Sequence, residues 1–406
     1  TSSVNRANLI SKAAFTFSPS VPFPTTGIPL QTPITKMFGI EFPIVAFTHC
    51  RDVVAAVTKA GGLGVLGAVA HSDEQLEIDM NWIEDEVGGR PYGVDLIVPA
   101  RYAGSEEGGL SVADLVEAIP GAHKEFVDEL LERYGVPVDS DTTRGWAERS
   151  DDAPFSANRA SRQMDVALAH QPALIANALG PPPAEMVERC HEAKVKVGAL
   201  AGSRVHAERH VAAGADVIIA QGTEGGGHTG QVGSMVLLPE VVDAVAPVPV
   251  LGAGGIGRGR QVAAAMALGA AGVWCGSVWL TTEEAETHPV VKKKMLAAGS
   301  GDTLRSRSMT GKPARMLRTA WTEEWDREDT PDPLGMPLQP MLTGTAIDRI
   351  NRAAHREGSG AEALATYFVG QVVGTMNRTR GAGQVVIDMM EEFIEATQAL
   401  ASHLET

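Results

Sequence analysis

The stretch AQGTEGGGHTG, residues 220–230, passes from an apolar strand into a glycine-rich loop that carries one histidine, His228. A second glycine turn, residues 252–257, and a Gly276-Ser277 pair each follow a further apolar segment. Glycine lets the backbone approach an anion closely, and the start of a following helix presents unpaired N–H groups. Three such turns in succession predict a phosphate-binding site; the alternative is that they are ordinary turns between strands and helices.

Short apolar segments alternate with helical patterns along most of the chain. Eight of them are predicted as strands, at residues 43–47, 63–66, 93–98, 173–177, 195–200, 216–220, 248–252 and 272–275. Nearly all-apolar strands that alternate with helices are typical of a parallel sheet covered on its outer face. Eight of them predict an α/β fold, the (β/α)8 TIM barrel, whose ligands bind at the carboxyl ends of the strands. All three glycine turns fall at those ends.

The spacing of the strands divides the chain into three parts. Residues 1–34 are expected to form an N-terminal arm, and residues 35–280 the barrel. The third and fourth strands are too far apart for a plain connection, so a helical insertion is predicted at about 100–170. A C-terminal helical extension is left for residues 281–406. Two of its helices are expected near 361–376 and 384–401. Insertion and extension are predicted to cap the barrel; the alternative is a contact within a homo-oligomer.

Composition and charge exclude several classes of partner. The 406 residues carry a formal charge of −16, and this acidity argues against nucleic-acid or anionic-membrane binding, because those partners favour basic surfaces. No apolar run reaches the roughly 18 residues of a membrane span. The three cysteines, Cys50, Cys190 and Cys275, are widely spaced and fit a reducing compartment. We expect a cytoplasmic protein with no membrane partner and no metal site.

Several segments together resemble the nitronate monooxygenase family and the related flavin-dependent enoyl-ACP reductases. Besides the glycine turns, they are TKMFGIEFPI (35–44), KAGGLG (59–64), PYGV (91–94), SMTGKPAR (308–315) and GQ (370–371). The resemblance implies a TIM barrel that holds FMN. It assigns the phosphate to Gly225, Gly226, Gly227, Gly254, Gly255, Gly276 and Ser277. It also implies that Gln221 lies beside the flavin, and that the residue at Asp95, usually an asparagine, contacts the ring or the ribityl chain.

Three positions depart from the family pattern. After the first strand the family usually has Gln-Ala-Pro-Met or Gln-Gly-Gly-Met, whereas this chain has Ala46-Phe47-Thr48-His49, so Phe47 and Thr48 are expected at the flavin. Ala178 stands where nitronate monooxygenases carry a catalytic histidine, which removes the expected base for nitronate oxidation. A carboxylate at Asp95 would oppose the negative charge of a reduced flavin unless it is protonated or paired.

His228 and His49 are the candidate catalytic residues. His228 follows three glycines at the predicted barrel mouth and matches the loop histidine of the enoyl reductases. Its alternative role is to hold the loop by bonding a backbone carbonyl. His49 lies just past the first strand, and its alternative is a surface or supporting position. Cys50 beside it is not expected to form a nucleophilic pair, because adjacent residues at a strand end often point apart.

A basic cluster stands out in this acidic chain. Its members are Arg305, Arg307, Lys312, Arg315 and Arg318. Such a cluster is suited to the phosphates of a CoA-type or nicotinamide substrate; the alternative is a solvated face that balances local acid.

These features predict an FMN-dependent oxidoreductase that acts on a small organic substrate, with a CoA thioester or NAD(P)H as a candidate reactant. Two chemistries stay open, nitronate oxidation and reduction of an activated alkene such as an enoyl thioester. In either, the cofactor supplies the hydride chemistry and the protein supplies position and a dry site. One alternative is a protein that binds FMN or another phosphorylated ligand without redox turnover. Another is a non-redox lyase or isomerase that uses the same phosphate site.

Overall fold

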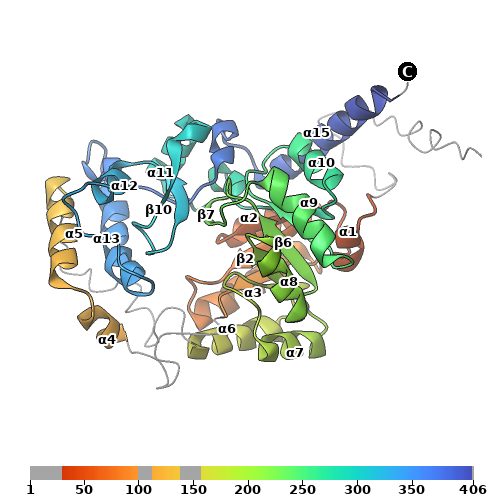
Figure 1. Cartoon of the computed structure of the whole chain (residues 1–406), viewed down its shortest axis with the longest axis horizontal. Helices are drawn as coiled ribbons and strands as arrows, with labels where there is room; N and C mark the ends of the chain where they lie inside the picture. Colours follow the sequence, from red (N-terminus) through yellow and green to blue (C-terminus); the bar gives the residue numbers. More distant parts are fainter. Residues whose placement is uncertain (1–29, 99–111, 138–156, 405–406) are drawn as a thin grey trace, which may run out of the picture.

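Eight parallel strands close into a barrel in the order β1-β2-β3-β4-β5-β6-β8-β9 in the computed structural model, which describes residues 30–98, 112–137 and 157–404 (Figure 1). The strands are β1 (Ile44–Thr48), β2 (Leu63–Gly67), β3 (Gly93–Leu96), β4 (Leu174–Asn177), β5 (Lys196–Ala201), β6 (Val217–Gln221), β8 (Val250–Ala253) and β9 (Gly272–Cys275). Each overlaps a segment predicted from the sequence, and the (β/α)8 fold is confirmed.

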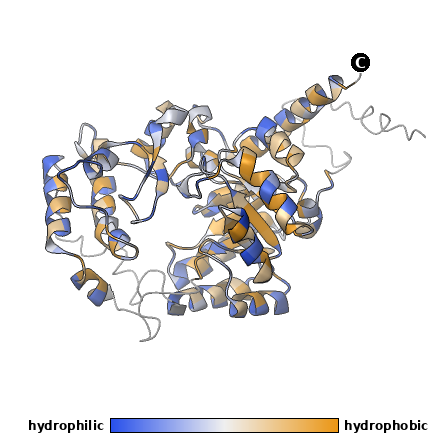
Figure 2. Ribbon diagram, in the orientation of Figure 1, coloured by the Kyte–Doolittle hydropathy of each residue, from blue (hydrophilic) through white to orange (hydrophobic). Residues whose placement is uncertain are grey.

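Helices surround the barrel on its outer face. They are α1 (Pro33–Phe38), α2 (Arg51–Lys59), α3 (Asp73–Val87), α6 (Ala157–Ala169), α7 (Ala184–Glu192), α8 (Arg204–Ala212), α9 (Ser234–Val245) and α10 (Gly259–Ala267). Alternate strand side chains point inward and outward. Val65 and Trp274 join the interior cluster, whereas Leu66 and Val94 pack outward with Met80 of α3. Apolar side chains on both faces explain why the strands read as continuous hydrophobic runs (Figure 2).

Helix α1 closes the amino end of the barrel. Ile34 and Phe38 belong to the interior cluster together with Leu63, Leu174 and Val217, the first residues of β2, β4 and β6. The opposite end, where the strands finish, is therefore the end left for a ligand.

A second core joins part of the insertion to the C-terminal extension. The insertion contributes α4 (Val112–Glu117) and α5 (Gly121–Arg133). The extension contributes η2 (Ser277–Thr281), α11 (Pro289–Ala297), η3 (Ser300–Asp302), β10 (Thr303–Ser306), β11 (Ala314–Leu317), α12 (Ala320–Trp325), α13 (Leu338–Ala354), α14 (Ala361–Leu364) and η4 (Gln371–Thr375). Phe126 of α5 meets the ring of Trp325 edge-on at 4.8 Å, and Leu130, Trp321 and Ile350 complete the contact. In Figure 1, α5 and α13 lie side by side, apart from the barrel.

The extension departs from the sequence prediction in two places. The single helix predicted at 361–376 is wrong. Only Ala361–Leu364 is α-helical; the chain then runs extended beside β11, with Leu317 N–H donating to Tyr367 O at 3.1 Å, before the short 3-10 helix η4. A run of β-branched and aromatic residues from Thr366 to Val369 accounts for this. Helix α13 was not predicted, because a proline-rich segment leads into it; Pro340 lies in its first turn, where a missing N–H costs nothing.

Some sequence predictions concern residues that the structure does not describe. Most of the predicted N-terminal arm, residues 1–29, and two segments of the insertion, 99–111 and 138–156, lie outside the described residues. The exact domain boundaries stay predictions. Among the helices of the described ranges, none is long and apolar enough to cross a membrane.

The last helix, α15 (Ala382–Ser402), returns to the barrel and packs on α10 and α2. The two backbones of α10 and α15 touch at Gly259, where an added Cβ would lie 2.0 Å from Met389 O. Glu392 of α15 accepts from Gly259 N at 2.9 Å and pairs with Arg258. Its carboxylate thus caps the start of α10 and favours the helix dipole.

We expect Glu392→Ala to lower the free energy of unfolding by about 1–2 kcal/mol, because the amino end of α10 and the Arg258 guanidinium both lose their acceptor. Chemical denaturation of the full chain measures the change. Glu395→Ala, at an exposed site on the same helix, is the matched control and should leave stability within about 0.5 kcal/mol. Equal effects of the two substitutions would contradict the capping role.

Candidate functional site

The carboxyl ends of β8 and β9 hold an open group of backbone amides. The N–H groups of Gly255, Gly276 and Ser277 find no acceptor among the described residues. Gly254 and Gly255 have φ values of +95° and +72°, a conformation that favours glycine. A Cβ added at Gly276 would meet only Phe47, at 3.7 Å, so the space beside it is free. This arrangement suits an anion bound by main-chain donors.

The helix starts near these loops do not supply free donors, contrary to the sequence expectation. Glu224 accepts from Ser234 N with both carboxylate oxygens at 3.0 Å and so caps α9. Glu392 caps the start of α10 in the same way, by accepting from Gly259 N. Because carboxylates already occupy both helix starts, an incoming phosphate has only the amides at the strand ends.

The glycines at 225–227 pack against the extension. A Cβ at Gly226 would lie 2.9 Å from Gly370 N, so this glycine allows two backbones to touch. Gly227 and His228 form the short strand β7 (Gly227–His228), which pairs with β11 in an antiparallel sheet of order β10-β11-β7. Gln221 Nε2 donates to Gly226 O at 3.4 Å and supports the same loop. The predicted phosphate contacts of Gly225, Gly226 and Gly227 stay predictions.

His228 is tied to the extension through its side chain. Its Nε2 lies 2.8 Å from Thr310 Oγ1, and that hydroxyl donates its hydrogen to Lys312 O at 3.1 Å. The imidazole must therefore carry its proton on Nε2 and donate it to Thr310. Although the residue is partly exposed, desolvation of the ring, with a further contribution from Lys312, lowers the pKa of His228 to about 4. At neutral pH the His228 ring is therefore uncharged, and its single N–H donates to Thr310.

His49 lies at the end of β1 over Gly67, whose missing side chain makes room for the ring. Its Nδ1 is 2.8 Å from Gly67 O, and because a carbonyl only accepts, Nδ1 carries the proton. Burial is the main cause that lowers the pKa of His49, partly offset by this hydrogen bond; the charge of His71 lowers it further. His49 is thus neutral at pH 7, and its Nε2 is a free proton acceptor.

A cavity of about 450 Å³ opens beside His49, between the barrel and the second core. It is lined from three directions. The end of β1 gives Thr48, His49 and Cys50; the segment leading into α11 gives Glu286 and His288; the extension gives Asn351, His355, Thr366 and Tyr367. Its size suits a small organic molecule. Sequence reasoning missed the residues from the last two groups, since no motif links them to β1.

The cavity is partly polar on the side of the extension. The His288 and His355 rings lie 4.2 Å apart. His288 Nδ1 accepts from Val290 N, so the proton sits on Nε2. Burial and the neighbouring His355 lower the pKa of His288. This wall therefore presents neutral imidazole rather than positive charge at pH 7.

Phe47 and Thr48 lie on β1 between the cavity and the barrel interior. The Phe47 ring stacks on Trp274 at 6.0 Å with an interplanar angle of 20°, and it meets His49 edge-on at 5.2 Å. Thr48 Oγ1 accepts from Cys50 N at 3.1 Å, which holds the turn into α2. The contacts of these two residues with a flavin are not tested by the structure.

Asp95 is buried on β3, and no ion pair joins it to another described residue. Only 4% of the residue is exposed, and no hydrogen bond joins its carboxyl group to a described residue. Burial raises the pKa of Asp95 well above its ordinary value. Of the two conditions noted from the sequence, protonation or pairing, burial favours protonation.

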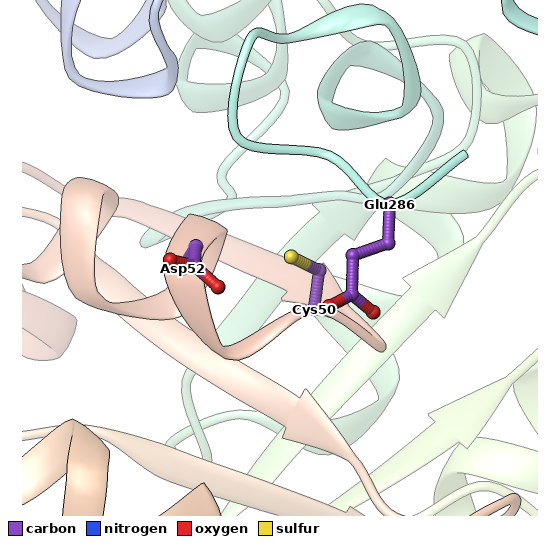
Figure 3. A group of neighbouring side chains, drawn as sticks. All are labelled: Cys50, Asp52 and Glu286. Carbon is purple, nitrogen blue, oxygen red and sulfur yellow. The ribbon is translucent and has the colours of Figure 1, made fainter. Parts of the chain in front are cut away.

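Cys50 lies close to two carboxylates, Asp52 of α2 and Glu286 of the segment before α11 (Figure 3). The three potential ligand atoms are within 4.8 Å of one another. The thiol donates to Glu284 O at 3.1 Å, while burial, with the charge of Glu286, raises the pKa of Cys50. A protonated thiol is neither a nucleophile nor a metal ligand. The geometry does not direct Cys50 at His49, whose Nδ1 is bonded to Gly67.

The end of β4 offers no proton-handling group. Ala178 N–H donates to Leu96 O at 3.1 Å, and the Asn177 side chain accepts from Val98 N at 3.0 Å. These contacts fix the turn between β3 and β4. A base that acts on a substrate would therefore come from another part of the chain.

The basic cluster holds backbone carbonyl groups. Arg305 and Arg315 donate to Thr229 O and Thr223 O at 2.9 and 3.0 Å, at the two ends of the glycine loop. Arg307 donates to Gly311 O and Pro333 O. Three of the five predicted cations thus organise the β10-β11-β7 region, which gives them a structural role apart from any phosphate.

Comparisons with known proteins identify the family of the chain. A family model described as nitronate monooxygenase matches residues 31–392. A Mycobacterium tuberculosis protein described as a monooxygenase, Rv1533, is 60% identical over 371 residues, which cover 91% of this chain and 98% of that protein. Another protein of that organism, (3aS,4S,5R,7aS)-5-hydroxy-7a-methyl-1-oxo-octahydro-1H-indene-4-carboxyl-CoA dehydrogenase, is 32% identical over 301 residues, 73% of this chain and 68% of that one. A solved nitroalkane oxidase from Streptomyces ansochromogenes has a TM-score of 0.73 at 27% identity and covers 90% of this chain and 99% of its own.

We expect Lys312→Gln to raise the pKa of His228, because a positive charge that disfavours the imidazolium is removed. An NMR pH titration of the histidine ring signals measures the shift. Lys293→Gln, at an exposed lysine of α11, is the control and should leave the His228 signal unchanged. If both variants titrate like the wild type, desolvation alone sets the value.

Proposed function

Because the chain belongs to the nitronate monooxygenase family, we propose that it is a flavin-dependent oxidoreductase that binds FMN across the carboxyl end of the barrel. One observation carries the proposal. The open amides of Gly255, Gly276 and Ser277 follow the ends of β8 and β9, and β9 pairs with β1, whose end lines the 450 Å³ cavity. A phosphate site and a substrate-sized space are thus neighbours on one rim.

The residues present fit an FMN molecule. The three amides would hold the phosphate, and the Ser277 hydroxyl, which accepts from Gly370 N at 2.8 Å, keeps its own hydrogen free to donate. Phe47, Thr48 and Gln221 would border the ring. Bound FMN would supply hydride chemistry that no side chain provides. The protein would orient the substrate and exclude water around it.

We assign the proton-handling role to His49 in preference to His228. His49 lines the cavity, and its Nε2 is a free acceptor because Nδ1 is committed to Gly67 O. His228 lies in β7, away from the cavity lining, and its N–H is committed to Thr310. A group that takes or returns a proton must reach the reacting atom, and geometry decides this before the pKa does.

Of the two chemistries, we favour redox change next to an activating carbonyl, such as that of a thioester. Ala178 leaves β4 without a base, and the relative at 32% identity carries a CoA dehydrogenase name. Nitronate oxidation is the second candidate, favoured by the family and by the nitroalkane oxidase structure. The cavity has the neutral imidazoles of His49 and His288 and the exposed Glu286 at its wall, and so suits an uncharged reacting group, such as an acyl chain, better than an anionic nitronate.

The proposal is tested by the absorbance spectrum of the purified chain after reconstitution with FMN, followed by anaerobic titration with NAD(P)H, an enoyl-CoA and a nitronate. We expect a bound flavin that NAD(P)H reduces and an enoyl-CoA reoxidises. Gly276→Ala should weaken FMN binding at least about tenfold, because its methyl group enters the phosphate space. Gly301→Ala, at an open surface position, is the control. A protein that binds no FMN would refute the proposal, and bound FMN that no donor reduces would indicate a binding protein.

We expect His49→Gln to lower kcat by about 100-fold or more with FMN content unchanged, the usual contribution of a general acid or base. His228→Gln should cost less than about tenfold. The assay follows the oxidative direction, in which neutral His49 takes a proton from the carbon next to the carbonyl. In this direction wild-type kcat should fall as the pH drops through the lowered pKa of His49, and the variant should lose this pH dependence. Steady-state kinetics across pH provide the check; a larger loss at His228 than at His49 would reverse the assignment.

A further inference from the structure

We propose that Asp95 is a resident carboxylic acid that keeps its proton and donates a hydrogen bond to the bound flavin. The inference rests on the proposed function, and it concerns a residue that differs from the asparagine usual at this position.

The position of Asp95 aims its side chain into the barrel. On β3 it stands beside Gly67 of β2 and Ala176 of β4, and Ala176 belongs to the interior cluster. Side chains at one level of a parallel barrel point the same way, so Asp95 also faces inward. It lies at the penultimate position of its strand, close to the open carboxyl end. A ligand anchored on β8 and β9 that extends across this rim meets Asp95 on the far wall.

Among the residues that the structure describes, no cation pairs with the carboxyl group of Asp95. Oδ2 is fully buried and finds no hydrogen-bond partner among the described residues. Asp79, which is equally buried, shows the contrast: Arg51, His71 and Gln75 donate to it at 2.9, 3.0 and 2.8 Å. A buried carboxylate without such donors is costly, so the neutral acid is the stable form.

The titratable groups on neighbouring elements are directed elsewhere. His49, at the end of β1, donates to Gly67 O through Nδ1. His71, after β2, bonds Asp79 through Nε2. On the other side, β4 presents Ala176 and the amide of Asn177. Burial raises the pKa of Asp95, and no charge of another described residue contributes to the shift.

A protonated Asp95 can donate the proposed hydrogen bond to the flavin. A protonated carboxyl group carries one O–H donor and remaining acceptor capacity, so it reproduces the donor of an asparagine amide. A carboxylate would instead face the negative charge that a flavin gains on reduction. Buried polar atoms are as a rule hydrogen-bonded, so an Oδ2 atom without a partner among the described residues is suited to bonding a ligand.

The first experiment reads the protonation state in the flavin-free chain. Infrared spectroscopy at pH 7 should show a carbonyl band of a protonated carboxylic acid that shifts in D2O and is missing in Asp95→Asn. Asp85→Asn, at an exposed site of α3, is the control and should keep the band. A wild-type spectrum without such a band from pH 5 to 8 overturns the proposal, whether or not FMN binds.

The second experiment measures FMN affinity against pH. Wild-type affinity should fall by up to about tenfold per pH unit once the acid ionises, because one proton is linked to binding. Asp95→Asn should bind FMN within about threefold of the wild type at pH 7 and lose this slope. Equal slopes in the two proteins overturn the proposed hydrogen bond. Absence of FMN binding by the wild type refutes the proposed function instead, and the infrared band distinguishes the two failures.

Discussion

The pairing of β9 with β1 is the constraint on which the rest of the molecule depends. Val45 stands opposite Trp274 and Ala46 opposite Cys275, and this register closes eight parallel strands into a ring without a free edge. Closure brings the end of β1, with His49 and the cavity, next to the end of β9, with Gly276 and Ser277. Residues some 230 positions apart in the chain thus share one rim.

Two carboxylates at the rim already accept hydrogen bonds from helix starts, and this determines which N–H groups stay available to an anion. Glu224 and Glu392 cap α9 and α10, so the helix starts are neutralised and the amides at the strand ends remain as anion donors. Buried imidazoles and a buried carboxyl group add polar but uncharged positions around the same opening. An acidic chain can in this way offer a phosphate site without using its arginines, which hold backbone carbonyls instead.

Local signals explain which features were predictable. The barrel strands were found because each is a short apolar run, and the glycine turns because each follows such a run. The packing of α5 on α13 was not predictable, since it joins segments about 200 residues apart. Helix α13 did leave a signal, with buried positions at Thr343, Ala346, Ile350 and Ala353, but the prolines before it obscured that spacing. The far wall of the cavity comes from segments with no recognisable motif.

The return of α15 to the barrel has a mechanical consequence. The second core is attached at its beginning through Trp279, at its end through α15, and between them by the pairing of β7 with β11 and the contact of Gly226 with Gly370. A body attached at one point swings, whereas a body attached at several separated points cannot do so without breaking an attachment. A movement of the second core that widens the cavity would therefore also displace the glycine loop, which lies beside the proposed phosphate site.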